Sequence, residues 1–133
     1  MRFVALLVLA CGIGTAADVA CPWVGEPTAA GLLGGPVQAR ATKGSCEFLR
    51  PQRALRIEVH HMHDPAKDFA RYIKKCGKKA APIEGLGNQA FACSHGTIVG
   101  RVRDDAFEIR VTAPNDAAEV ARKAAEQVAG ALF

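Results

Sequence analysis

The chain has 133 residues, of which 50% are hydrophobic and 23% are charged, and its formal net charge is +4. The sequence holds no low-complexity tract and no convincing internal repeat, which excludes repeat and low-complexity architectures. A net charge of this size is ordinary for solubility and decides little about partners.

The N-terminus predicts export. Met1-Arg2 forms a short positive region, and residues 3–10 are uninterrupted apolar sequence. The apolar stretch of about fifteen residues is shorter than the roughly twenty that a membrane-spanning helix needs. Thr15-Ala16-Ala17 supplies small residues at the −3 and −1 positions of a cleavage site. We therefore expect a signal peptide over residues 1–17 and a mature chain that starts at Asp18.

An alternative leader lies in the same segment. Val8-Leu9-Ala10-Cys11 resembles the lipobox of bacterial lipoproteins, in which Cys11 would carry the lipid. That leader would be very short, and Leu before Ala is unusual there. Cleavage after Ala17 is the favoured prediction. It removes Arg2, lowers the net charge to +3 and leaves residues 18–133 as a single domain with one core.

The first half of this domain predicts a short helix followed by strands. Thr28 can cap a helix over residues 29–33, and Gly34-Gly35 can end it. Alternating apolar and polar residues predict three strands, over residues 37–42, 45–50 and 55–60.

The next segment predicts an amphipathic helix that Asp64 caps, Pro65 begins and Gly77 ends. The residues expected on its buried stripe are Ala66, Phe69, Ala70, Ile73 and Cys76. The cations on its other side and at its exit are Lys67, Arg71, Lys74, Lys75, Lys78 and Lys79. They could contact an anionic envelope polymer or lipid headgroups. A solvated face whose last-turn lysines suit the helix dipole is the favoured interpretation.

The second half predicts more strands and a closing helix. A strand over residues 89–93 leads to a turn at Ser94-His95-Gly96, and a hairpin with its connection at Asp104-Asp105 follows. The inward residues of this hairpin are Ile98, Gly100, Val102, Phe107, Ile109 and Val111, and the outward Arg101, Arg103, Glu108 and Arg110 can pair across strands. Residues 116–119 have the capping-box pattern. The buried face of the last helix is expected to hold Ala117, Val120, Ala121, Ala124, Val128 and Leu132.

These elements predict an α+β fold. The expected order is α-β-β-β-α-β-β-β-α, with an antiparallel sheet of five or six strands packed against helices. The segment around Pro82 separates the two halves, and Pro82 itself is expected to lie outside regular elements because it lacks an amide donor.

The same segment contains a possible nucleotide motif. Gly85-Leu86-Gly87-Asn88-Gln89-Ala90 satisfies the dinucleotide fingerprint G-x-G-x-x-G/A. The motif needs a buried strand before it and a helix after it, and neither pattern is present. We interpret residues 85–88 as a loop whose Leu86 can reach into the core, and we expect no cofactor.

Two further patterns could carry chemistry. His60-His61-Met62-His63-Asp64, with His95 elsewhere, could form a copper or zinc site. A polar strand end that runs into a helix cap is the favoured interpretation, because spacing alone supplies too few ligands. Ser94-His95 is merely adjacent in sequence, which does not make a catalytic pair. We expect no metal site, no catalytic residues and no enzymatic activity.

Four cysteines remain in the predicted mature chain, and four allow three disulfide connectivities. Cys76 lies on the buried stripe of its helix, and Cys93 shares a strand face with Phe91. The two thiols should therefore meet between helix and sheet. An even cysteine count in an exported chain is typical of disulfides rather than of a catalytic thiol.

The layout resembles a family of small exported bacterial envelope proteins, many of them lipoproteins of unknown function. The segments that carry the resemblance are Cys21, Thr28–Gly34, Ser45–Phe48 and Pro82–Phe91. The resemblance implies an extracytoplasmic α+β domain and a disulfide between Cys21 and Cys46. It brings no catalytic residues, and the poor lipobox is a departure from it.

The resulting functional prediction is a non-enzymatic exported domain with a binding or structural role in the cell envelope. The alternative is a metal-binding or metal-handling protein that uses the His60–His63 tract. We expect an envelope component as the partner, no nucleic acid, and membrane anchoring only if Cys11 is lipidated.

Overall fold

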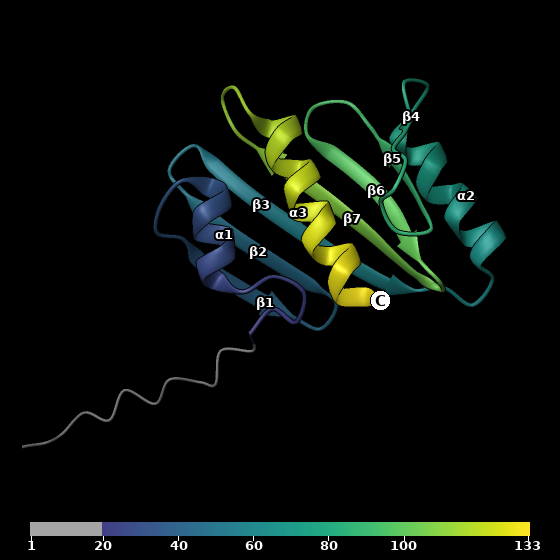
Figure 1. The fold of residues 1–133 in the computed structure, drawn as a ribbon, viewed down its shortest axis with the longest axis horizontal. Coiled ribbons are helices and arrows are strands. Elements are labelled where there is room, and N and C mark those ends of the chain that lie inside the picture. Colours follow the sequence, from purple (N-terminus) through teal and green to yellow (C-terminus); the bar gives the residue numbers. More distant parts are fainter. Residues whose placement is uncertain (1–19) are drawn as a thin grey trace, which may run out of the picture.

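The computed structural model describes residues 20–133 (Figure 1). The predicted signal peptide, its cleavage site before Asp18 and the alternative lipid site at Cys11 lie outside these residues. The helices of the described chain are α1 (Glu26–Leu33), α2 (Pro65–Cys76) and α3 (Ala117–Leu132). The strands are β1 (Gln38–Thr42), β2 (Ser45–Arg50), β3 (Arg53–His61), β4 (Ala81–Pro82), β5 (Gln89–Ala92), β6 (Thr97–Val102) and β7 (Asp105–Thr112).

All seven strands form one antiparallel sheet in the order β1-β2-β3-β7-β6-β5-β4. The predicted α+β class and antiparallel sheet are confirmed. The sheet has seven strands rather than the predicted five or six, because the short strand β4 was not predicted. Pro82 pairs with Phe91 at the edge of the sheet. Proline is tolerated at an edge because no donor is needed on the outer side.

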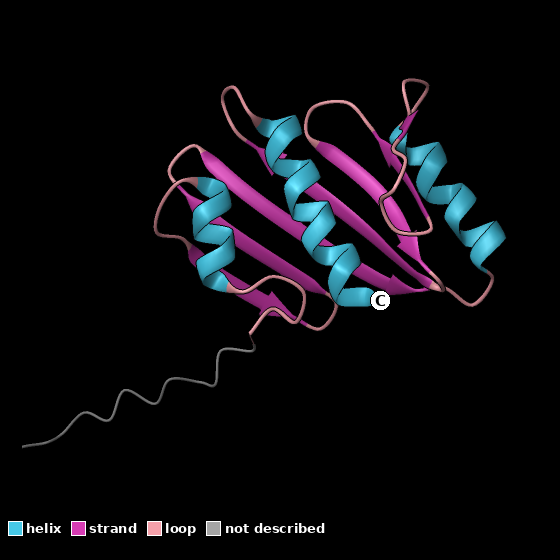
Figure 2. Cartoon of the chain, viewed as in Figure 1, coloured by secondary structure: helices cyan, strands magenta, loops and turns pink. Residues whose placement is uncertain are grey.

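Helices α1 and α3 lie side by side on one face of the sheet and cover the main core (Figures 1 and 2). The largest fully buried side chains of that core are Phe48, Phe107, Leu33, Leu55, Ile57 and Ile109. Helix α3 buries four alanines, Ala121, Ala124, Ala125 and Ala129, which let its backbone approach the strands closely. Burial of each large side chain contributes about 1.5–3 kcal/mol to folding.

Helix α2 packs on the opposite face of the sheet, over β5 and β6. Its contact is a smaller cluster of Phe69 with Met62 and Ala106, and Tyr72, Ile73 and Phe91 pack against this cluster. The predicted stripe is confirmed at Phe69, Ile73 and Cys76 and wrong at its two alanines. Ala66 and Ala70 are exposed, and the contacting residues are Phe69, Tyr72, Ile73 and Cys76, which repeat the same spacing from Phe69 onward.

Three local boundaries also differ from prediction. Helix α1 begins at Glu26 rather than after Thr28, because Gly25 occupies the N-cap and Pro27 suits the first turn. The last hairpin turns at residues 103–104, one position before the predicted connection, with Arg103 at φ 54°. Asp116 makes no side-chain capping bond, because its carboxylate pairs with Arg53 instead, at 2.8 Å.

Two disulfides tie the peripheral elements to the sheet. Cys21 is bonded to Cys46 of β2, and Cys76 at the end of α2 is bonded to Cys93, which follows β5. These are the two pairs that the sequence and the family resemblance predict. Their sequence separations of 25 and 17 residues correspond to about 3 kcal/mol of stabilisation each in the loop-entropy model. Two disulfides in so small a domain indicate an oxidising environment.

Candidate functional site

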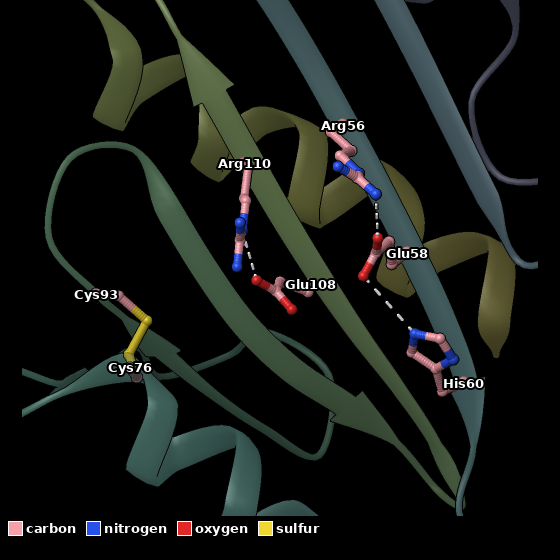
Figure 3. Close-up of polar contacts among 7 residues, drawn as sticks. All are labelled: Arg56, Glu58, His60, Cys76, Cys93, Glu108 and Arg110. Atoms are coloured by element: carbon pink, nitrogen blue, oxygen red, sulfur yellow. Dashed lines mark hydrogen bonds and ion pairs between the residues drawn. A yellow bond between two sulfur atoms is a disulfide. The ribbon is translucent and has the colours of Figure 1, made fainter. Parts of the chain in front are cut away.

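The second face of the sheet is only partly covered. Helix α2 packs over the β5–β6 side, and within residues 20–133 no helix lies over β1, β2 and β3 on this face. The uncovered surface carries polar side chains from alternate strand positions. We call its central part the open face, which consists of Arg56, Glu58 and His60 from β3 and Glu108 and Arg110 from β7 (Figure 3).

The register of β3 and β7 places like charges directly opposite each other. Arg56 faces Arg110, and Glu58 faces Glu108. Opposing residues on one face of an antiparallel pair have Cβ atoms only about 4.5–5.5 Å apart, so like charges there destabilise the sheet. We call the first pair the basic row and the second the acidic row.

The ion pairs of the open face run along the strands instead of across them. Arg56 Nη2 lies 2.8 Å from Glu58 Oε1, and Arg110 Nε donates to Glu108 Oε1 at 2.6 Å (Figure 3). His60 Nε2 lies 3.7 Å from the second oxygen of Glu58. The predicted cross-strand pairing of Glu108 and Arg110 is therefore corrected, because a strand neighbour of opposite charge lies two residues away on the same face.

Helix α2 forms a wall beside the two rows. A cavity of about 200 Å³ lies where the helix meets the sheet, and its lining includes Tyr72, Lys75, the Cys76–Cys93 disulfide, Glu108 and Arg110. The Glu108 side chain is only 14% exposed. Burial raises the pKa of the Tyr72 hydroxyl above its ordinary value, and the negative charges of Glu108, Glu58 and Asp68 raise this pKa further. The ring of Tyr72 lies 6.4 Å from that of His60.

The side chains of the histidine tract do not share one face of the sheet, because successive residues of β3 point to opposite faces. His60 lies at the open face, Met62 is buried, and the rings of His61 and His63 lie 5.9 Å apart and nearly perpendicular. The Nδ1 atom of His61 lies 3.1 Å from Asp105 Oδ1. The part of the chain that the structure describes contains no group of three or more His, Cys, Asp or Glu side chains placed to hold a metal ion.

The glycine segment has the geometry of a tight loop between strands. Gly85 and Gly87 have φ values of 76° and 60°, and the 4%-exposed Leu86 joins the main core as predicted. Strand β5 follows, not a helix, so no helix amides face a pyrophosphate. A Cβ atom on Gly87 would lie 2.6 Å from the Arg101 carbonyl oxygen. Close packing against β6 therefore accounts for glycine at this position without a bound nucleotide.

Sequence reasoning missed Arg56, Glu58 and the opposition of like charges. Alternation in each strand predicts which side chains share a face, but the opposing partners depend on the pairing of β3 with β7. A systematic comparison of outward charges between all pairs of predicted strands could have raised this pairing as one option.

The wider molecule was examined for membrane-spanning helices and for similarity to known proteins. No helix within residues 20–133 is both long and apolar enough to cross a membrane. No protein-family model, no curated protein and no solved structure matches the chain. A functional assignment therefore depends on the geometry of its own residues.

Proposed function

We propose that the protein is a non-enzymatic, extracytoplasmic binding domain whose open face contacts a polar cell-envelope component that carries both positive and negative groups. The observation behind this proposal is the opposition of Arg56 to Arg110 and of Glu58 to Glu108. Each like-charge pair costs stability on a surface where opposite charges would add it. Conflicts between local chemistry and fold stability are expected at functional sites.

The rows have spare hydrogen-bonding capacity. Each guanidinium has five N–H donors and each carboxylate has about four acceptor positions, and the ion pairs within β3 and β7 use few of them. Anionic groups of a ligand could bind between Arg56 and Arg110. Its cationic groups could bind between Glu58 and Glu108, beside the wall formed by Tyr72.

Two observations support binding in an extracytoplasmic compartment. The disulfides Cys21–Cys46 and Cys76–Cys93 favour an oxidising environment. The leader pattern and the resemblance to exported envelope proteins agree with that, and both remain predictions.

The test uses the full chain with both disulfides formed, studied by amide NMR. The probes are vesicles of zwitterionic phospholipid, vesicles with added anionic phospholipid, and purified cell-wall polymer. We expect at least one probe to shift the amides of β3 and β7. Shifts confined to the α1–α3 side, or none with any probe, would contradict the proposal.

A matched variant separates the rows from general charge. Exchange of Arg56→Glu with Glu58→Arg keeps composition and net charge but places opposite charges across β3 and β7. This variant should lose the response to the probe. The double substitution Arg122→Glu with Glu126→Arg makes the same exchange on the exposed side of α3 and should leave the response unchanged.

A further inference from the structure

A second cleft lies on the helical side of the sheet, away from the open face. It has a volume of about 460 Å³, and it is lined by the end of α1, the start of α3 and the residues on either side of the β2–β3 turn. Figure 1 shows α1 and α3 side by side on this face of the sheet. The charged lining residues of the cleft are Arg50, Arg53, Asp116, Glu119 and Lys123. We call it the Arg50 cleft after one of these residues.

Three buried side-chain atoms at this cleft have no hydrogen-bond partner within the described residues. They are Arg50 Nε, Arg53 Nε and Asp116 Oδ1. Buried polar atoms are almost always hydrogen-bonded, so each exception calls for a partner of its own. Here the three exceptions belong to residues that line the same cleft, and they comprise two N–H donors and one carboxylate acceptor.

The surrounding fold holds the three side chains in position. Arg53 Nη2 donates to Asp116 Oδ2 at 2.8 Å, which fixes the start of β3 to the start of α3. Arg50 Nη1 donates to the Pro36 carbonyl oxygen at 3.3 Å. A Cβ atom on Gly35 would overlap the Arg50 guanidinium, so the absence of a side chain there makes room for it.

The charges at the cleft leave one cation in excess. Asp116 pairs with Arg53, and Glu119 pairs with Lys123 at 3.1 Å. Arg50 forms no ion pair within residues 20–133. A ligand that complements the cleft is therefore an anion.

The free acceptor narrows the chemistry of that anion. The hydrogen bond from Arg53 is the main cause that lowers the pKa of Asp116, so this carboxylate is ionised at neutral pH and can only accept. An anion bound beside Asp116 Oδ1 must itself donate an O–H, while its other oxygens accept from the two Nε–H groups. We propose that the Arg50 cleft binds a hydroxyl-bearing oxyanion, namely inorganic phosphate or a phosphomonoester in its singly protonated form.

Sulfate provides the matched comparison. It has the size and shape of phosphate but carries no proton at neutral pH, so it cannot donate to Asp116. The full chain with both disulfides formed is titrated with inorganic phosphate, glycerol phosphate and sulfate at equal ionic strength, with the Arg Nε–H resonances followed by NMR. We expect at least one phosphate compound to bind about tenfold more tightly than sulfate and to shift the Nε–H signals of Arg50 and Arg53.

Variants test the assigned roles. Arg50→Gln should weaken phosphate binding about tenfold, because the unpaired cation is lost. Arg40→Gln removes an arginine of the exposed edge strand β1 that likewise forms no ion pair within the described chain, and it should leave binding unchanged. Asp116→Asn should raise sulfate affinity to that of phosphate, because an amide can donate where the carboxylate repels. Thermal unfolding of each variant shows whether it remains folded.

Each outcome either supports or contradicts phosphate binding at the Arg50 cleft. Tighter binding of glycerol phosphate identifies an esterified source and tighter binding of inorganic phosphate a free one, and both support the inference. Equal affinities for phosphate and sulfate in the unmodified protein would overturn it, as would equal losses in Arg50→Gln and Arg40→Gln. If neither phosphate compound binds, the inference is wrong, while the proposed function of the open face is unaffected.

Discussion

Glu58 of β3 lies directly opposite Glu108 of β7, and the neighbouring residues two positions away on the same face are again a pair of like charges. Each glutamate is compensated along its own strand, by Arg56 at 2.8 Å and by Arg110 at 2.6 Å. Neighbouring strands lie about 4.8 Å apart, whereas residues two positions apart along a strand are separated by about 6.7 Å. The backbone positions of the like-charged residues are therefore closer than those of the oppositely charged residues, although the side chains of the latter turn toward each other.

Exchange of the charges on β3 should stabilise the protein. Arg56→Glu combined with Glu58→Arg turns two repulsive cross-strand pairs into attractive ones, because the new carboxylate lies opposite Arg110 and the new guanidinium opposite Glu108. We expect the free energy of unfolding to rise by about 0.5–1 kcal/mol at low salt. Urea unfolding at low and high salt measures it, and screening should reduce the gain. A loss of stability at low salt would show that the rows do not repel.

The Cys76–Cys93 disulfide should be the main attachment of α2. Phe69 is the one buried residue of this helix, and its cluster is small. Replacement of both cysteines by alanine should lower the free energy of unfolding by about 3 kcal/mol. Hydrogen exchange should accelerate in α2 more than in α3, which buries six residues. Equal acceleration in both helices would mean that α2 is not an independent unit.

Much of this architecture follows from the sequence because its signals are local. The alternation in β3 and the part of the predicted α2 stripe formed by Phe69, Ile73 and Cys76 depend only on the chain's own periodicity. Strand β4 gave no such signal, since it has two residues and one is proline. The face that α2 takes, the β3–β7 register and the gathering of Arg50, Arg53 and Asp116 around one cleft depend on contacts between distant segments. Those contacts create both candidate sites, which explains why sequence reasoning missed them.

Two glycines should respond oppositely to alanine. A Cβ atom on Gly100 of β6 would overlap the ring of Phe107, which is fully buried in the core, whereas Gly130 of α3 has nothing within 4 Å of that position. Gly100→Ala should destabilise the fold by about 1–3 kcal/mol through overpacking. Gly130→Ala should stabilise it by about 0.5–1 kcal/mol through helix propensity. Thermal unfolding of both variants and of the unmodified protein measures the two changes in stability.

A second substitution identifies the cause of the Gly100 effect. Phe107→Leu replaces the ring that meets the new methyl group with a smaller side chain. In the Gly100→Ala background it should therefore recover part of the lost stability. If the two losses simply add, the ring is not the obstacle and the packing explanation for Gly100 is wrong.

The histidine tract should not hold a tightly bound metal. His61 and His63 lie near each other, but the nearest carboxylate partner of His61 is Asp105, and the described residues bring no further ligand to this pair. Zinc and copper sites normally need three or four protein ligands. Titration of the purified full chain should show no stoichiometric binding. Tight binding that His61→Ala with His63→Ala abolishes would make metal handling the better functional assignment.

The Arg53–Asp116 pair should contribute a pH-dependent part of the stability. The hydrogen bond from Arg53 is the main cause that lowers the pKa of the Asp116 carboxyl in the folded protein, and the charge of Arg53 lowers this pKa further. A depressed folded pKa means that the unfolded state takes up the proton first. The contribution is therefore complete above the ordinary aspartate value of about 3.9 and disappears as the pH falls through the lowered folded value.

Urea unfolding of the unmodified protein and of Asp116→Asn across acidic pH measures this contribution. At neutral pH the variant should be less stable, and the two free energies of unfolding should converge below the folded pKa of Asp116. Arg53→Gln should remove the same pH-dependent difference, and the double variant should add little to either single one, because both lose one shared interaction. A constant difference at every pH would show that Asp116 acts through packing rather than through its charge.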